Sequence, residues 1–132
     1  MSIADVNGTH LMPSRLNFRQ KDPRGWQEFR DHMAEHSVLG SASIFRGVQL
    51  RRTPIFDLQA RLHELHVPTL LMIGDEDEPC VEPTLFMKRH IPGTRLIVFP
   101  CSGHAINLEE PDLFNRTVLD FITSAETERK ME

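Results

Sequence analysis

The chain has 132 residues, of which 39% are hydrophobic and 26% are charged, and its formal net charge at pH 7 is -4. This length and composition are typical of one globular domain at most. The slight excess of acidic residues argues against nucleic acid or an anionic membrane as a partner. No apolar run approaches the ~18 residues of a membrane span, and residues 1–20 lack the apolar core of a signal peptide, so we expect a cytoplasmic location.

The N-terminal part of the chain predicts a loose end followed by a helix. Residues 1–21 show no persistent hydrophobic period, so we expect a poorly structured segment. Asp22 followed by Pro23 is a typical helix start, because the acid can cap and the proline lacks only an N–H that has no partner there. Apolar residues at spacings of three and four follow, and Leu39-Gly40 is expected to end the helix near Val38.

Two further helical segments are expected before the first strand. Residues 41–52 have a looser apolar pattern that indicates a short helix, and residues 53–65 repeat the cap-and-proline start with helical spacing. Three arginines gather in the first of these segments. We interpret them as a solvated helix face rather than a binding site for a substrate carboxylate. They are Arg46, Arg51 and Arg52.

Two short apolar runs dominate the second half of the chain. Thr69–Ile73 and Leu96–Phe99 have no polar alternation, which is typical of strands that are covered on both faces. A helix-length piece lies between them, in which Pro79 and Pro83 are followed by a short predicted helix that ends near His90. Such a crossover makes the strands parallel and brings their carboxyl ends to one edge of the sheet, where open α/β sheets keep their active sites.

Each apolar run is followed by a turn with an ionisable residue. Gly74 and a cluster of acidic residues follow the first run, and Gly103-His104 follows the second. An acid and a histidine that are far apart in sequence are therefore expected to become neighbours. The turn alone leaves both Asp77 and Asp75 as candidate acids. An acidic turn residue can also act only as a helix cap, and a loop histidine can be merely solvated.

The C-terminal part predicts one more helix and a tail. Pro111 opens a segment with an apolar face that should pack on the sheet, and residues 126–132 are charged and expected to be disordered. No cofactor is expected. Cys80 and Cys101 both follow predicted strands, so a metal site that they form with Asp77 and His104 is an alternative. Neither cysteine belongs to a Cys-x-x-Cys motif, so we expect no metal site and interpret them as space-filling residues.

The order Gly74-x-x-Asp77, Gly103-His104 and a helix started by Pro111 resembles the C-terminal part of the α/β-hydrolase family. The resemblance is specific over about residues 67–122. It implies an α/β class and a partial α/β-hydrolase fold, in which two parallel strands have flanking helices. It further implies the end of a lid at residues 22–52 and a core segment at residues 53–125.

The same resemblance implies a catalytic role for two residues. Asp77 would be the catalytic acid and His104 the base of a hydrolase that cleaves an ester, a lactone or a related bond of a small molecule. None of the seven serines has glycines two residues before and after it, and the family's nucleophile precedes the lid. We therefore expect this chain alone to be inactive.

Two alternatives remain open on the sequence. In the first, the chain is one half of a two-chain hydrolase and an N-terminal chain brings the nucleophile. In the second, the chain is a non-catalytic binding or dimerisation module. Two parallel strands without further partners expose an unpaired edge, so we also expect low stability or self-association.

Overall fold

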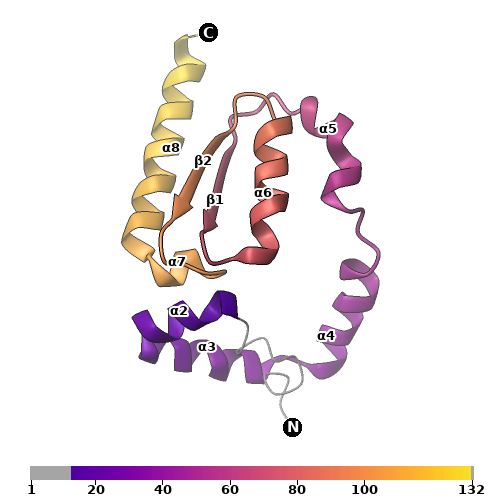
Figure 1. Ribbon diagram of the computed structural model, residues 1–132, viewed down its shortest axis with the longest axis vertical. Helices are drawn as coiled ribbons and strands as arrows, with labels where there is room; N and C mark the ends of the chain where they lie inside the picture. Colours follow the sequence, from indigo (N-terminus) through magenta and orange to yellow (C-terminus); the bar gives the residue numbers. More distant parts are fainter. Residues whose placement is uncertain (1–12, 132) are drawn as a thin grey trace.

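The computed structural model describes residues 13–131 (Figure 1). The elements in chain order are α2 (Pro13–Lys21), α3 (Pro23–Glu35), α4 (Val38–Ile44), the π-helix η2 (Phe45–Gln49), the 3-10 helix η3 (Ile55–Leu58), α5 (Gln59–His63), β1 (Leu70–Gly74), α6 (Glu78–His90), β2 (Arg95–Phe99), α7 (Ile106–Glu109) and α8 (Pro111–Met131).

The two strands pair in parallel and α6 is the crossover between them. The register runs from Leu70 opposite Arg95 to Gly74 opposite Phe99, so both strands end at the same edge. In Figure 1, α6 lies along one side of the sheet and α8 along the other, and α2 and α3 lie beyond the carboxyl ends of the strands. This arrangement confirms the α/β class, and each strand lies within one residue of its predicted bounds.

The expectation that residues 1–21 are poorly structured is wrong where it can be checked. Residues 1–12 lie outside the described part, but Pro13–Lys21 forms α2. One side chain fixes this helix: Phe18 is fully buried and contacts Trp26 and Phe29 edge-on, with ring centroids 5.7 and 6.1 Å apart. A single buried phenylalanine leaves no period in the sequence, which is why the pattern did not reveal the helix.

The predicted end of the helix that starts at Pro23 is also wrong. The helix ends at Glu35, and Ser37 begins α4 by accepting a hydrogen bond from the Gly40 N–H at 3.1 Å. Gly40 is therefore inside α4 and does not stop a helix. A serine cap two residues after the end of a helix restarts the chain as a new helix, and this local capping outweighs the glycine.

Two later helices are longer than the sequence predicts. α6 begins at Glu78, because Pro79 lies in the first turn, where a proline costs nothing, and the helix tolerates Pro83 in its interior. α8 continues to Met131, so the expected disorder from residue 126 is wrong for residues 126–131. Arg95 holds this last part of α8 through Ser124, at 3.0 Å, and through Glu128.

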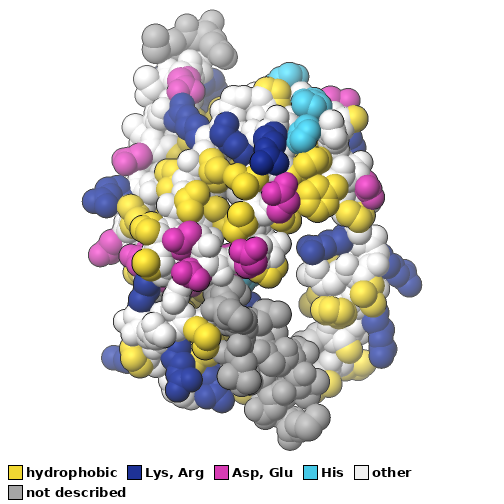
Figure 2. Space-filling model, in the orientation of Figure 1, with side chains coloured by type: hydrophobic (Ala, Val, Ile, Leu, Met, Phe, Trp, Pro, Cys, Tyr) yellow, Lys and Arg dark blue, Asp and Glu magenta, His cyan; other side chains and the backbone are white. Residues whose placement is uncertain are grey.

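The sheet leaves apolar surface uncovered. Ile97 is 36% exposed and Val98 is 51% exposed, although both belong to a strand whose sequence is typical of double coverage. In Figure 2, apolar side chains gather in the middle of the viewed face, over the strands and α6. In the described residues the sheet has only these two strands, so both outer edges lack a strand partner. No helix in residues 13–131 has the length and apolar character needed to cross a bilayer.

Candidate active site

The acid-bearing turn joins β1 directly to α6. The backbone N–H of Asp77 bonds to the carbonyl of Gly74 at 3.2 Å, which closes a tight turn at the end of the strand. Asp77 occupies the position before the first residue of α6, but its side chain caps no backbone N–H of that helix. Only 8% of this side chain is exposed. A buried carboxylate that does not cap its helix needs another partner, which argues against a role as a mere cap.

The histidine-bearing turn follows β2. Cys101 has a φ of 52°, which lies in the left-handed region, and this conformation reverses the chain after the strand. Ser102, the next residue, is fully buried. The turn therefore presents His104 at the same edge of the sheet as Asp77.

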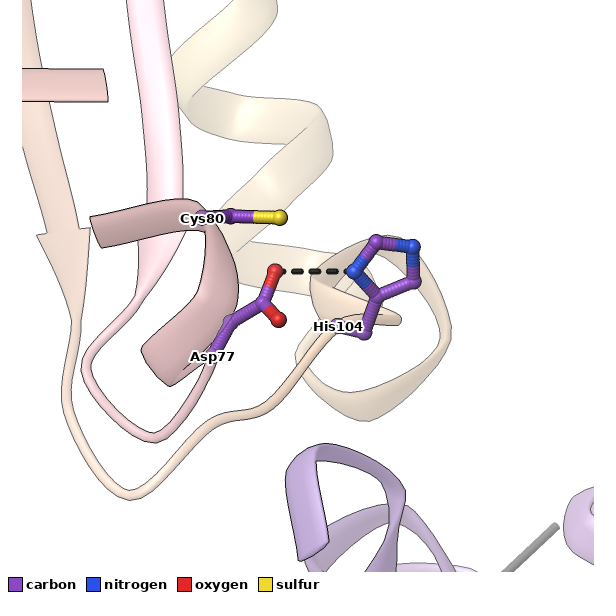
Figure 3. A group of neighbouring side chains, drawn as sticks. All are labelled: Asp77, Cys80 and His104. Atoms are coloured by element: carbon purple, nitrogen blue, oxygen red, sulfur yellow. Dashed lines mark hydrogen bonds and ion pairs between the residues drawn. The ribbon is translucent and has the colours of Figure 1, made fainter. Parts of the chain in front are cut away.

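The two predicted residues meet in the structure (Figure 3). The ring nitrogen Nδ1 of His104 lies 2.8 Å from Oδ2 of Asp77. An ionised carboxylate only accepts hydrogen bonds, so Nδ1 carries the proton and donates it. The other ring nitrogen points away from the carboxylate, and 49% of the His104 side chain is exposed. The pair thus has a fixed inner side and an accessible outer side.

Hydrogen bonds between the two turns hold this geometry. The N–H groups of Asp75 and Glu76 donate to the carbonyls of Phe99 and Ser102, at 3.1 and 2.9 Å. In return, Oδ1 of Asp75 accepts a hydrogen bond from the Ser102 N–H at 3.1 Å. This bond is the largest cause that lowers the pKa of Asp75. Asp75, the alternative acid, therefore positions the loop that carries His104 by bonding to the backbone of that loop.

Glu109 is a site residue that sequence reasoning missed. Its carboxylate is buried and accepts hydrogen bonds from the Gly103 N–H, at 2.9 and 3.1 Å to its two oxygens, and from the Ala105 N–H at 3.2 Å. It therefore holds the backbone on both sides of His104. No signal in the sequence distinguished this acid, because Glu109 stands beside Glu110 just before Pro111 and the short helix α7 that carries it was not predicted.

Gly74 allows the two turns to approach so closely. A Cβ atom at this position would lie 2.2 Å from the carbonyl oxygen of Ser102 and 2.4 Å from that of Gly103. A Cβ atom essentially never lies within 3.0 Å of a heavy atom from a residue that is not its neighbour in the chain. The glycine is therefore needed for the contact between the acid turn and the histidine turn.

A third reactive side chain borders the pair. Asp77, Cys80 and His104 line a hollow of about 230 Å³ at the end of the sheet. Burial of Cys80, followed by its hydrogen bond to Asp77 and the charge of that residue, raises the pKa of the thiol to about 11. The thiol is therefore protonated at neutral pH, unlike an activated cysteine nucleophile.

Comparison with known proteins places this geometry in a family. No protein-family model matches the chain. The chain is 30% identical to the putative 2-succinyl-6-hydroxy-2,4-cyclohexadiene-1-carboxylate synthase of Bacillus subtilis over 95 residues, which are 72% of the chain and 34% of that protein. It is 31% identical to the putative carbamate hydrolase RutD of Agrobacterium fabrum over 113 residues, 79% of the chain and 42% of that protein.

The solved structure of MenH from S. aureus superimposes on the chain with a TM-score of 0.82 and 26% identity, covering 92% of the chain and 45% of that structure. The chain belongs to the α/β-hydrolase family. It matches the C-terminal part of these α/β-hydrolases and spans between about a third and a half of their length. The fold and the family that the sequence resembles are thus confirmed.

Proposed function

We propose that this chain supplies the catalytic acid, Asp77, and the catalytic base, His104, of a hydrolase triad. The observation that carries the proposal is the 2.8 Å hydrogen bond between Nδ1 of His104 and Oδ2 of Asp77 at the carboxyl edge of a parallel pair. In this arrangement Asp77 fixes the tautomer of the imidazole and stabilises the imidazolium ion. The exposed ring nitrogen, Nε2, takes the proton of the nucleophile and later gives it to the leaving group.

The proposed reaction is the hydrolysis of an ester, a lactone or a related bond in a small molecule. The family carries the reaction class, and its members act on different bonds, as the carbamate hydrolase among the relatives illustrates. We further propose that residues 22–52 are the end of a lid and residues 53–125 the core segment. The position of α3 beyond the carboxyl ends of the strands supports the lid (Figure 1).

The proposal requires a nucleophile from outside these 132 residues. The sequence contains no Gly-x-Ser-x-Gly motif, and Cys80, the nucleophilic residue beside the pair, has a raised pKa. We therefore propose that the chain alone forms no acyl-enzyme. It becomes active only when a further polypeptide of the hydrolase fold brings the nucleophile and the backbone donors of the oxyanion hole.

A second candidate function is supported by the uncovered apolar surface. Exposed apolar residues on β2 and on the α4–η2 segment suit association with another protein surface. A binding or dimerisation module would retain such a surface without using the acid and the histidine. The exposed residues are Val38, Leu39, Ile44, Phe45, Val48, Ile97 and Val98.

A chimera tests the hydrolase proposal. The matched C-terminal part of the putative carbamate hydrolase RutD of A. fabrum would be replaced by this chain, and an activated ester would report the acyl-enzyme burst. We expect a stoichiometric burst from the chimera and none from the isolated chain. His104→Ala should reduce turnover by about 10⁶, whereas His66→Ala, which changes an exposed loop histidine, should leave turnover unchanged.

Full activity of the His104→Ala chimera would refute the role of His104. If the isolated chain binds a partner or itself equally well after Asp77 and His104 are both replaced, the binding module is favoured.

A further inference from the structure

Three side chains with different ligand atoms converge at the end of the sheet. A carboxylate oxygen of Asp77, the sulfur of Cys80 and a ring nitrogen of His104 all lie within 4.8 Å of one another. Figure 3 shows the sulfur and the imidazole on neighbouring sides of the same carboxylate. Within residues 13–131, this is the only group of three or more such residues with that spacing. Neither cysteine belongs to a sequence motif for metal binding, and from the sequence we expected no metal site, whereas the structure brings these three ligand atoms together.

The three ligand types suit a zinc ion. Zn²⁺ prefers thiolate, imidazole and carboxylate ligands in tetrahedral geometry, and open sites use three protein ligands and a water. Around a tetrahedral zinc, neighbouring ligand atoms lie ~3.5 Å apart. The hydrogen-bonded atoms of Asp77 and His104 are now 2.8 Å apart, and the whole cluster fits within 4.8 Å, so side-chain movements of about 1 Å would complete the geometry.

The backbone at all three positions is already held by hydrogen bonds. Asp77 and Cys80 are joined by the first turn of α6, in which the Cys80 N–H donates to the Asp77 carbonyl at 2.8 Å. Glu109 holds the backbone on both sides of His104. Fixed ligands lose little conformational freedom when a metal binds, which favours affinity. The exposed face of His104 leaves a path for the ion and room for the water.

We propose that Asp77, Cys80 and His104 bind one Zn²⁺ ion. On binding, the Cys80 sulfur loses its proton to solvent, since a coordinating thiol is deprotonated by the metal. Nδ1 of His104 gives up the hydrogen bond to Asp77, its proton passes to Nε2, and both Nδ1 and the carboxylate oxygen bond to the ion. One proton is released per ion. The bound metal occupies both members of the acid–histidine pair, so it prevents this pair from acting as a base. The zinc proposal rests only on these three side chains and does not require that Asp77 and His104 be catalytic.

Cobalt absorption tests the site directly. The full chain, freed of metal, would be titrated with Co²⁺, which absorbs in the near ultraviolet when a thiolate binds it. We expect this band in the wild type and in Cys101→Ser, and we expect Zn²⁺ to displace it while Mg²⁺ does not. Cys80→Ser should lose the band. His104→Ala should weaken Zn²⁺ binding at least tenfold, since even loss of an outer partner of a ligand costs that much.

Two outcomes of the titration would overturn the proposal. A band that survives in Cys80→Ser would place the metal on other ligands, and absence of a band in Cys101→Ser would exclude the site. Circular dichroism checks that each variant is folded.

A second measurement does not depend on the folding of a Cys80 variant. In the Cys101→Ser chain, Cys80 is the only thiol, because the sequence has two cysteines. Saturating Zn²⁺ should slow its alkylation by iodoacetamide at least tenfold, and half of this protection should require at least tenfold more Zn²⁺ when His104→Ala is added. An alkylation rate that Zn²⁺ does not change would contradict the proposal.

Discussion

Gly74→Ala is the substitution that most directly tests how the two turns are held together. The added Cβ would lie 2.2 Å from the Ser102 carbonyl oxygen and must move to at least 3.0 Å. The obstacle is backbone on both sides, so the acid turn and the histidine turn must separate by roughly 0.8 Å, the difference between these distances. The hydrogen bond from the Glu76 N–H to the same oxygen, now 2.9 Å, would become too long.

The expected cost follows from these two effects. Overpacking costs about 1–3 kcal/mol and the lost hydrogen bond about 1 kcal/mol, so the free energy of unfolding should fall by about 2–4 kcal/mol. In the chimera with the A. fabrum carbamate hydrolase, a displacement of nearly 1 Å should lower turnover by about 100-fold. Urea unfolding followed by circular dichroism measures the first quantity, and the activated-ester assay measures the second.

Gly47→Ala is the matched control. A Cβ at Gly47 meets nothing within 4 Å and the residue lies in a helical segment, so this variant should be as stable as the wild type or about 0.5–1 kcal/mol more stable. If the free energy of unfolding of Gly74→Ala lies within about 0.5 kcal/mol of the wild-type value, the close packing of the two turns is refuted.

Three further predictions concern the carboxylates and the thiol around the pair. The hydrogen bond from the Ser102 N–H lowers the folded-state pKa of Asp75 from 3.8, so the stability that Asp75 contributes should be present above pH 3.8 and be lost as the pH falls through the folded-state pKa. Urea unfolding should show Asp75→Asn less stable than the wild type at pH 7. A stability difference that persists at pH 2 would contradict this. Glu109→Gln should lower the free energy of unfolding by about 2 kcal/mol, because the buried carboxylate of Glu109 accepts backbone hydrogen bonds. Glu110→Gln at the surface should lower it by at most about 1 kcal/mol. Equal losses would count against the role of Glu109. Because its pKa is raised from 9.0 to about 11, Cys80 should react with iodoacetamide about tenfold more slowly at pH 7 than an unperturbed thiol. Asp77→Asn should speed this reaction, and an unchanged rate in that variant would refute the influence of Asp77 on the thiol.

The sequence predicted the strands and the meeting of an acid with His104 because both depend on local patterns. The choice of Asp77 over Asp75 came from the resemblance to the α/β-hydrolase family. Two apolar runs with a crossover between them dictate a parallel pair, and the turn after each strand then lies at one edge. The acid and the histidine meet for this topological reason, and no long-range contact had to be guessed. Their catalytic role remains a proposal.

The sequence did not reveal the parts that depend on single long-range contacts. α2 is fixed by Phe18, which packs on α3, and Lys21 at its end donates to Ser102 Oγ at 3.0 Å. Glu109 reaches back to the histidine loop through three backbone N–H contacts. Such contacts leave no periodic trace, so neither the helix nor the buried acid was predicted.

The tautomer of His104 tests the central claim most directly, namely that its imidazole donates to Asp77 and leaves Nε2 free to take a proton. Nitrogen NMR of the isotope-labelled chain identifies which ring nitrogen of the neutral imidazole is protonated, since that choice is set by the hydrogen bond the ring makes. The structure predicts a proton on Nδ1 in the wild type and loss of this preference in Asp77→Ala. A wild-type spectrum with the proton on Nε2, or one that Asp77→Ala leaves unchanged, would contradict the account.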